Sequence, residues 1–156
     1  MIELNVSGFG PLTLEHLVSD FTGTLSVNGT LLPDVKDKLI DISRSLRIHV
    51  LTADTFRTAR AEITGIPCQV QVLTGKYIDV QKEKYVNTLG AEKVVAFGNG
   101  INDRKMLKAS KLGIAVVGEE GCAVEALLSA NIQVTNIIDG LDLLLNSKRL
   151  TATLRY

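Results

Sequence analysis

The stretch LTLEHLVSDFTGT at residues 12–24 places an acidic residue at the end of an apolar run. Residues 12–19 alternate between apolar and polar side chains closely enough to predict a β-strand. Asp20 follows that strand, and Gly23 in the loop behind it allows a ligand to approach the backbone. Ligands of open α/β sheets bind beyond the carboxyl ends of the strands. This position predicts a nucleophile at Asp20, with a turn-initiating aspartate as the alternative.

Predicted strands and helices alternate along the rest of the chain. Strands are predicted at 2–6, 12–19, 24–27, 30–32, 47–51, 68–73, 93–97, 112–117 and 132–134. Helices are predicted from Pro33 through Leu46, between an N-cap at Asp54 and a stop at Gly65, at 77–89, around Met106, at 122–129 and at 137–145. Repeated βα units imply an α/β fold with a mostly parallel sheet and helices on both faces.

Two further segments complete the predicted organisation of the chain. Asn28-Gly29 predicts a tight hairpin turn between two short strands. The tail at 151–156 is compatible with disorder or with an edge strand. Since no linker, repeat or low-complexity tract interrupts the pattern, we expect residues 1–156 to form a single domain.

The composition argues against two classes of partner. Lys+Arg and Asp+Glu both number 17, so the chain has no net charge to attract nucleic acid or an anionic membrane. Aromatic residues make up only 4% with no Trp, which argues against a platform for stacking bases. No run reaches the roughly 18 apolar residues of a membrane span, and we expect no signal peptide.

The cysteines and histidines show no metal-binding pattern. Cys68 and Cys122 lack a CxxC spacing, which predicts reduced, buried thiols and a cytoplasmic location. His16 and His49 fall within predicted strands without the spacing of metal ligands. We therefore expect both histidines to be hydrogen-bonded core residues or surface residues.

Polar residues near the predicted strand ends suggest phosphoryl chemistry. The Asp20 carboxylate can accept a phosphoryl group and form an aspartyl phosphate. Donors and cations must then converge on the phosphoryl oxygens. Thr52 offers a hydroxyl and an amide at a predicted helix start, and Lys82 offers a point positive charge. Asp20, Asn99 and Asp103 supply the hard oxygen atoms that Mg²⁺ prefers.

Several of these residues also have structural interpretations. Lys76 and Lys84 compete with Lys82 for the place in the site. Asn99 could instead be a structural turn residue. Asp103 could instead be a carboxylate that only stabilises the start of a helix. The sequence leaves these alternatives open.

Four segments in this order resemble the haloacid dehalogenase (HAD) superfamily of phosphohydrolases, and above all the phosphorylation domain of P-type ATPases. They are DFTGT at 20–24, LTAD at 51–54 with RTA at 57–59, Lys82, and GNGIND at 98–103. The resemblance runs from about Leu14 to Val117 and extends to small soluble P-type ATPase-like HAD proteins. It implies a Rossmann-like HAD core.

The resemblance also implies a role for each site residue. Asp20 is then the nucleophile, and Thr52 and Lys82 hold the phosphoryl oxygens. Mg²⁺ is then bound by the Asp20 carboxylate, the Thr22 backbone carbonyl and Asn99. Asp103 is expected in or just outside that shell, and Thr24 and Asn102 are expected to orient the loops.

The chain departs from the phosphatase pattern at two positions. HAD phosphatases carry a second Asp, two residues after the nucleophile, as the general acid and base, and Thr22 stands there, as in the pumps. Such catalysis is worth about 10²–10⁴-fold, so we expect slow turnover and an aspartyl phosphate that forms more readily than it hydrolyses. Asn99 replaces a metal-binding Asp, so we expect weaker Mg²⁺ binding.

The interval between Asp20 and Thr52 holds only a hairpin and a helix, so no large cap domain is expected. Such an open site would admit a phosphorylated small molecule or a phosphoprotein, and by analogy the chain is a possible homo-oligomer. ATP use is not implied, since no nucleotide-binding domain is inserted. We expect a Mg²⁺-dependent phosphatase of the EC 3.1.3 type. The alternative is a weakly catalytic or non-catalytic phosphate-binding or phosphorylatable module that regulates a protein partner.

Overall fold

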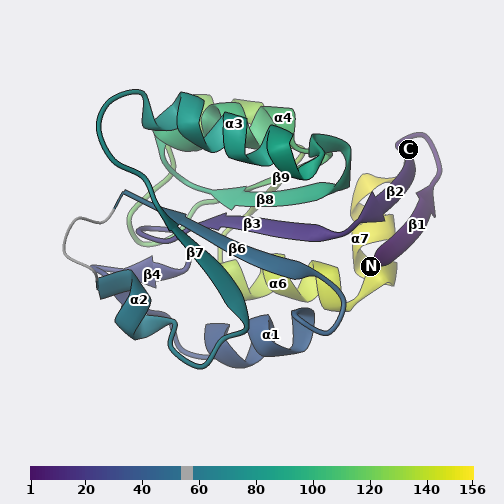
Figure 1. Ribbon diagram of the computed structural model, residues 1–156. Coiled ribbons are helices and arrows are strands. Elements are labelled where there is room, and N and C mark those ends of the chain that lie inside the picture. Colours follow the sequence, from purple (N-terminus) through teal and green to yellow (C-terminus); the bar gives the residue numbers. More distant parts are fainter. Residues whose placement is uncertain (54–57) are drawn as a thin grey trace.

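The computed structural model describes residues 1–53 and 58–156 and centres on a six-stranded parallel sheet (Figure 1). The strands lie in the order β10-β9-β8-β3-β6-β7. Their bounds are β3 (His16–Asp20), β6 (Arg47–Thr52), β7 (Cys68–Val72), β8 (Val94–Gly98), β9 (Leu112–Val116) and β10 (Ile132–Val134). The parallel pairing brings the carboxyl ends of all these strands to one edge of the sheet.

Helices cover both faces of the sheet, as predicted. On one face lie α3 (Ile78–Leu89), α4 (Arg104–Ala109) and α5 (Val124–Ser129), and on the other lie α1 (Val35–Ile42) and α6 (Ile137–Leu145) (Figure 1). The remaining helices are α2 (Thr58–Glu62), α7 (Ser147–Leu154) and the 3₁₀ turns η1 (Ala91–Lys93) and η2 (Ile101–Asp103). Consecutive residues of β3 enter different apolar clusters, Leu17 on the α1 side and Val18 on the α3 side. This double burial is typical of a central parallel strand.

The predicted strand at 12–19 is wrong in one respect, because it divides at Glu15. Its first part is β2 (Gly10–Leu14), which pairs antiparallel with β1 (Ile2–Val6) outside the main sheet. At Glu15 the amide donates to the Lys93 carbonyl and the carbonyl accepts from Arg47, both at 2.9 Å. The apolar pattern continues across the break because Leu12 and Leu14 are also buried.

The predicted hairpin is confirmed with shorter strands, β4 (Ser26–Val27) and β5 (Thr30–Leu31). Asn28 and Gly29 at its turn have φ angles of 52° and 79°, the left-handed conformations that such a tight turn requires. The helix expected from Pro33 begins at Val35, because Asp34 adopts a left-handed φ of 67°.

The tail is neither disordered nor a strand. Residues Ser147–Leu154 form α7, whose first turn is capped by the Asn146 side chain, and which packs against β1 and α6. Leu150 and Leu154 are buried at a helical spacing. The prediction failed because it considered residues 151–156 apart from the cap and the first turn that precede them.

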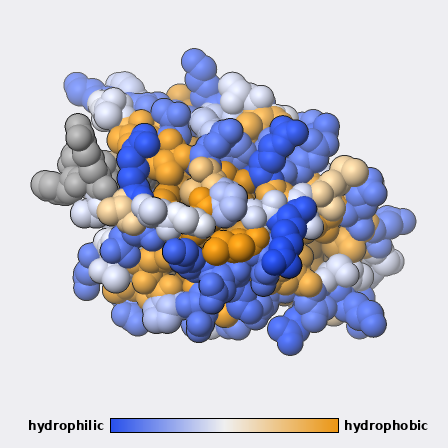
Figure 2. Space-filling model, turned by 60° about the horizontal axis from the view of Figure 1, so that its bottom comes forward, coloured by the Kyte–Doolittle hydropathy of each residue, from blue (hydrophilic) through white to orange (hydrophobic). Residues whose placement is uncertain are grey.

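The helices are short, and one side of the molecule carries mainly hydrophilic side chains (Figure 2). No helix among the described residues is long and apolar enough to cross a bilayer. Figure 2 shows hydrophilic side chains over most of the side that carries α1, with small hydrophobic areas between them. Cys68 and Cys122 are free, as predicted, but only half-buried.

Candidate active site

Three of the sequence-predicted segments meet at the carboxyl edge of the sheet. Asp20 ends β3 and Thr52 ends the neighbouring strand β6, while the 98–103 segment begins at the end of β8 on the other side of β3. Parallel register aligns Asp20 with Leu51. The fold therefore brings these three loops to the same edge of the sheet.

A cavity of about 640 Å³ opens at this edge. Its lining includes six of the eight predicted site residues: Asp20, Thr22, Thr52, Lys82, Asn99 and Asn102. The other two, Thr24 and Asp103, are buried. The cavity wall is completed by Asn28, Gly29, Ala53, Thr58 and Gly100.

Lys82 reaches the site from the second turn of α3. Its side chain is only 1% exposed, and its Nζ lies 2.7 Å from Asp20 Oδ1 and 2.6 Å from Asp103 Oδ1. Nζ also donates to Asn102 Oδ1 at 3.1 Å. The competing lysines, Lys76 and Lys84, are exposed. Of the three candidates, the fold therefore brings Lys82 to the predicted nucleophile.

The Asp103 carboxylate holds Lys82 and the loop after β8 together. One oxygen binds Lys82, and the other accepts from the amides of Asn99 at 3.0 Å and Gly100 at 2.9 Å. Gly98 makes room for this arrangement, because a Cβ there would lie 2.5 Å from the Asp103 Cβ. With these donors in place, Asp103 lies behind Lys82 and positions the loop.

The Asn99 side chain is held with its oxygen toward the predicted nucleophile. Its Nδ2 donates to the Gly121 carbonyl at 3.1 Å, and its Oδ1 accepts from the Thr24 hydroxyl at 3.1 Å. The same hydroxyl lies 3.4 Å from Asp20 Oδ2. Gly23 is required here, because its φ is +79° and a Cβ would lie 2.5 Å from Asn99 Nδ2.

The oxygens of this site suit a hard divalent cation. Asp20 Oδ2 and Asn99 Oδ1 converge on one hydroxyl, and Thr22 is exposed on the cavity wall beside them. Within residues 1–53 and 58–156, no group of three or more His, Cys, Asp or Glu side chains is arranged to hold a metal ion. A cation would therefore need the amide and backbone oxygens as well as the carboxylate, a donor set that Mg²⁺ accepts.

The surroundings of Asp20 and Lys82 raise the pKa values of both side chains. Burial, followed by the negative charge of Asp103, raises the pKa of Asp20 to about 7, against the opposing effect of Lys82. Burial lowers the pKa of Lys82, but the charges of Asp20 and Asp103 outweigh it and raise that pKa above its ordinary value. Lys82 is thus a permanent cation at neutral pH.

Sequence reasoning missed the groups that support the cavity. Thr58, the first residue of α2, lines it; the RTA motif at 57–59 includes this residue but assigns it no role in the site. The hairpin turn at the mouth is tied down by Glu120, which accepts from the Asn28 amide at 3.1 Å, and nothing in the sequence signals this contact. The predicted cap Asp54 and the motif residue Arg57 lie outside the described residues.

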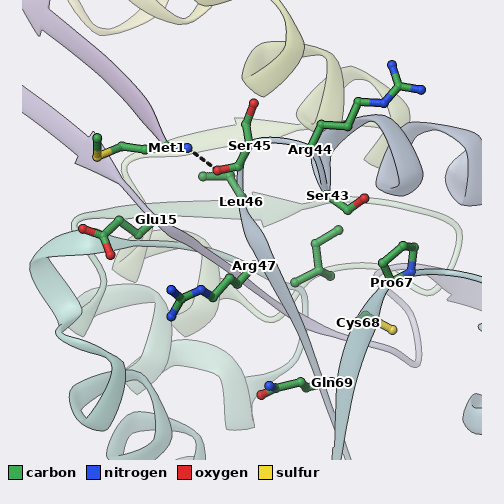
Figure 3. Close-up of a pocket in the computed structure, with 11 residues that line it drawn as sticks. Met1, Glu15, Ser43, Arg44, Ser45, Leu46, Arg47, Pro67, Cys68 and Gln69 are labelled. Atoms are coloured by element: carbon green, nitrogen blue, oxygen red, sulfur yellow. Dashed lines mark hydrogen bonds between the residues drawn. The ribbon is translucent and has the colours of Figure 1, made fainter.

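A second cavity, of about 650 Å³, lies at the opposite edge of the sheet (Figure 3). Its charged residues do not converge: Figure 3 shows Arg44 and Arg47 pointing in different directions. Glu15 pairs with the exposed Lys93 and Arg44 with the exposed Asp41. This cavity therefore lacks the focused polar groups of an active site.

Sequence comparisons relate the chain to known proteins. The family model of haloacid dehalogenase-like hydrolases matches residues 76–120, which include Lys82 and the 98–103 loop. An uncharacterized protein of Methanocaldococcus jannaschii is 52% identical over 64 residues, which cover 41% of this chain and 69% of that protein.

Solved structures with a similar fold include a phosphatase and a domain of an ATPase. The 3-deoxy-D-manno-octulosonate 8-phosphate phosphatase of Moraxella catarrhalis, solved with magnesium, phosphate and KDO, superposes with a TM-score of 0.64 at 16% identity, covering 91% of this chain and 94% of that one. A zinc-transporting PIB-type ATPase superposes with a TM-score of 0.63 at 25% identity, covering 79% of this chain and 20% of the ATPase. At 16% identity the likeness to the phosphatase shows a shared fold.

Proposed function

The chain belongs to the haloacid dehalogenase-like hydrolases, and we propose that it is a Mg²⁺-dependent phosphatase that acts through an aspartyl phosphate on Asp20. Its parallel sheet with helices on both faces, without a large cap in the described residues, agrees with the predicted fold class. The observation that carries the proposal is the buried Lys82, bound to both Asp20 and Asp103 at the carboxyl edge.

The proposed reaction begins with attack of an Asp20 carboxylate oxygen on phosphorus. A P–O bond forms to Asp20 as the bond to the leaving oxygen breaks. Lys82 and the Thr52 hydroxyl are the proposed ligands of the phosphoryl oxygens, and both line the cavity beside Asp20. Mg²⁺, held by Asp20, the Thr22 carbonyl and Asn99, would supply positive charge that offsets repulsion between the carboxylate and the phosphoryl group.

The second step returns the nucleophile. Water attacks phosphorus, the P–O bond to Asp20 breaks, and inorganic phosphate leaves. At Thr22 a hydroxyl replaces the carboxyl group that would protonate the leaving oxygen and then activate this water. Water must serve in both proton transfers instead, so we propose that both steps are slow, by about 10²–10⁴-fold.

The open cavity supports a phosphorylated small molecule or a phosphoprotein as substrate. Its mouth is bordered by a two-residue hairpin turn, Asn28-Gly29, and by α2, so no folded cap among the described residues restricts the size of the substrate. The second candidate, a phosphorylatable regulatory module, is favoured specifically by Thr22, because a slowly hydrolysed aspartyl phosphate suits a signal.

Chemical trapping tests the proposal and separates the two candidates. The protein is incubated with Mg²⁺ and p-nitrophenyl phosphate or acetyl phosphate, release of product is followed, and borohydride then reduces any acyl phosphate. A phosphatase gives turnover together with conversion of Asp20 to homoserine, detected by mass spectrometry. Trapping without turnover identifies the regulatory module. Turnover with no change at Asp20 would contradict the proposed mechanism.

A further inference from the structure

The two buried histidines, which the proposed reaction does not use, form a hydrogen-bonded chain with the half-buried Tyr85. His16 Nδ1 lies 3.0 Å from His49 Nε2, and His49 Nδ1 lies 2.9 Å from the Tyr85 hydroxyl. We propose that these hydrogen bonds fix the position of α3 along β3 and β6 and thereby hold Lys82 against Asp20. His16, His49 and Tyr85 are thus positioning residues, and the inference deepens the proposed function because it concerns the same site.

The hydrogen-bonded chain joins three of the elements that carry the site, β3, β6 and α3. His16 lies four residues before Asp20 in β3, and His49 lies three residues before the cavity residue Thr52 in β6. Tyr85 lies one turn after Lys82 in α3, so the two side chains share a face of the helix. Each positioning residue is therefore only a few residues from the site residue on its own element.

The direction of each element matches this arrangement. The crossover from β7 through α3 to β8 runs α3 antiparallel to the strands, along one side of the sheet (Figure 1). Tyr85 is then farther from the carboxyl edge than Lys82, just as His16 is farther than Asp20. At about 3.3 Å per strand residue, His16 lies about 13 Å behind Asp20, and His49, which pairs with Val18, lies about 7 Å behind it.

Apolar packing alone would leave this position poorly defined. Around the hydrogen-bonded chain, α3 meets the sheet in an apolar cluster that contains Val86 from the helix and Val18 and Leu51 from the strands. The hydrophobic effect has no preferred direction, so such a contact tolerates sliding of the helix. Hydrogen bonds prefer a narrow range of distances and angles, so they supply the register that the apolar contact lacks.

The surroundings keep the hydrogen-bonded chain neutral and intact. Burial, followed by the charges of His16 and Arg47, lowers the pKa of His49 to about 4, while a hydrogen bond that the Gln69 side chain accepts opposes this. Burial and Arg47 also lower the pKa of His16, against the attraction of Glu15. A neutral imidazole donates through one nitrogen and accepts through the other, so a single direction of donation runs through all three side chains at neutral pH.

Tyr85→Phe breaks the hydrogen-bonded chain with the loss of a single oxygen atom. In the metal-free protein, burial protects the Lys82 ammonium group from exchange with water, so its ¹H–¹⁵N signal can be observed. We expect Tyr85→Phe to shift or broaden this signal. We also expect kcat for p-nitrophenyl phosphate to fall about 10- to 100-fold, because misplacement by about 1 Å costs that much, while KM changes little. His49→Leu should act in the same way, and His49→Gln should restore part of both readouts.

The matched control is Ser110→Ala, which removes a buried hydroxyl that donates to the Met106 carbonyl at 2.8 Å on the same side of the sheet. It should lower Tm by an amount similar to Tyr85→Phe and leave the Lys82 signal and kcat unchanged. An unmoved Lys82 signal with unchanged kcat in Tyr85→Phe would overturn the proposal. If the wild type gives neither turnover nor an aspartyl phosphate, the proposed function fails, while the Lys82 signal still decides the positioning role.

Discussion

Two cavities of nearly equal volume, about 640 and 650 Å³, lie at opposite edges of the same parallel sheet. At the carboxyl edge, buried charges converge within hydrogen-bond distance of one another, with Lys82 between Asp20 and Asp103. At the amino edge the charged side chains diverge and pair with exposed partners (Figure 3). Volume therefore does not distinguish the two, and the convergence of desolvated polar groups does.

The sharpest way to test this contrast is to change one carboxylate to an amide at each end of β3. Asp20→Asn should reduce phosphatase turnover by at least about 10³-fold, because the proposed nucleophile is lost. Glu15→Gln, just before the start of the same strand, should leave turnover within a few fold. Steady-state assays of both variants with p-nitrophenyl phosphate check this, and equal losses would refute the assignment of the site.

Removing one lysine at each edge compares a buried ion pair with an exposed one. Lys82→Met should lower the free energy of unfolding by about 3 kcal/mol, because two carboxylates lose their buried partner. Lys93→Met, which removes the exposed partner of Glu15, should change Tm only slightly. Urea denaturation of both variants measures the difference, and similar midpoints would mean that Lys82 is not held by its ion pairs.

Adding a carboxylate at each edge tests the missing acid and base. Thr22→Asp should raise turnover by about 10²-fold, because it supplies a general acid and base beside Asp20. Ser43→Asp adds the same charge at the other cavity and should have no such effect. If Thr22→Asp still binds Mg²⁺ and gives no gain in kcat, the explanation of slow hydrolysis is wrong.

The pH dependence of stability should differ in sign between the buried histidine and the nucleophile. The pKa of His49 falls from 6.5 to about 4 on folding, so its contribution to stability is complete above pH 6.5 and is lost as pH falls toward 4, by at most about 3 kcal/mol. Asp20, with its pKa raised to about 7, makes the metal-free protein less stable as pH rises toward 7. The difference in unfolding free energy between the wild type and His49→Gln from pH 4 to 7 isolates the histidine. A flat difference would contradict the lowered pKa.

Most of the fold was predictable because its signals are local. Apolar residues at every second position located the strands of the main sheet, and helical spacing located the helices on its faces. Asn28-Gly29 predicted the hairpin turn. The errors arose where a distant partner decides the structure. Glu15 looks like the middle of a strand, yet its backbone changes bonding partners there. The α7 helix depends on docking of Leu150 and Leu154 against the rest of the protein.

The candidate site was predictable as a set of residues and not as a network. The motifs pointed to Asp20, Thr52 and the 98–103 loop because strand ends of a parallel sheet must share an edge. They did not reveal that Asp103 holds Lys82 and two loop amides, nor that Gly121 fixes the Asn99 amide. These contacts depend on side-chain directions that no spacing encodes.

The sequence by itself determined which chemical groups stand at the ends of the strands, because alternation and turn residues act within a few positions of one another. Tertiary structure alone decided which of three lysines is buried against the nucleophile, and it alone joined His16, His49 and Tyr85 by hydrogen bonds. The physical reason is that each of these contacts links residues far apart in the sequence. Their distances depend on how α3 packs across the sheet, which is a property of the whole core.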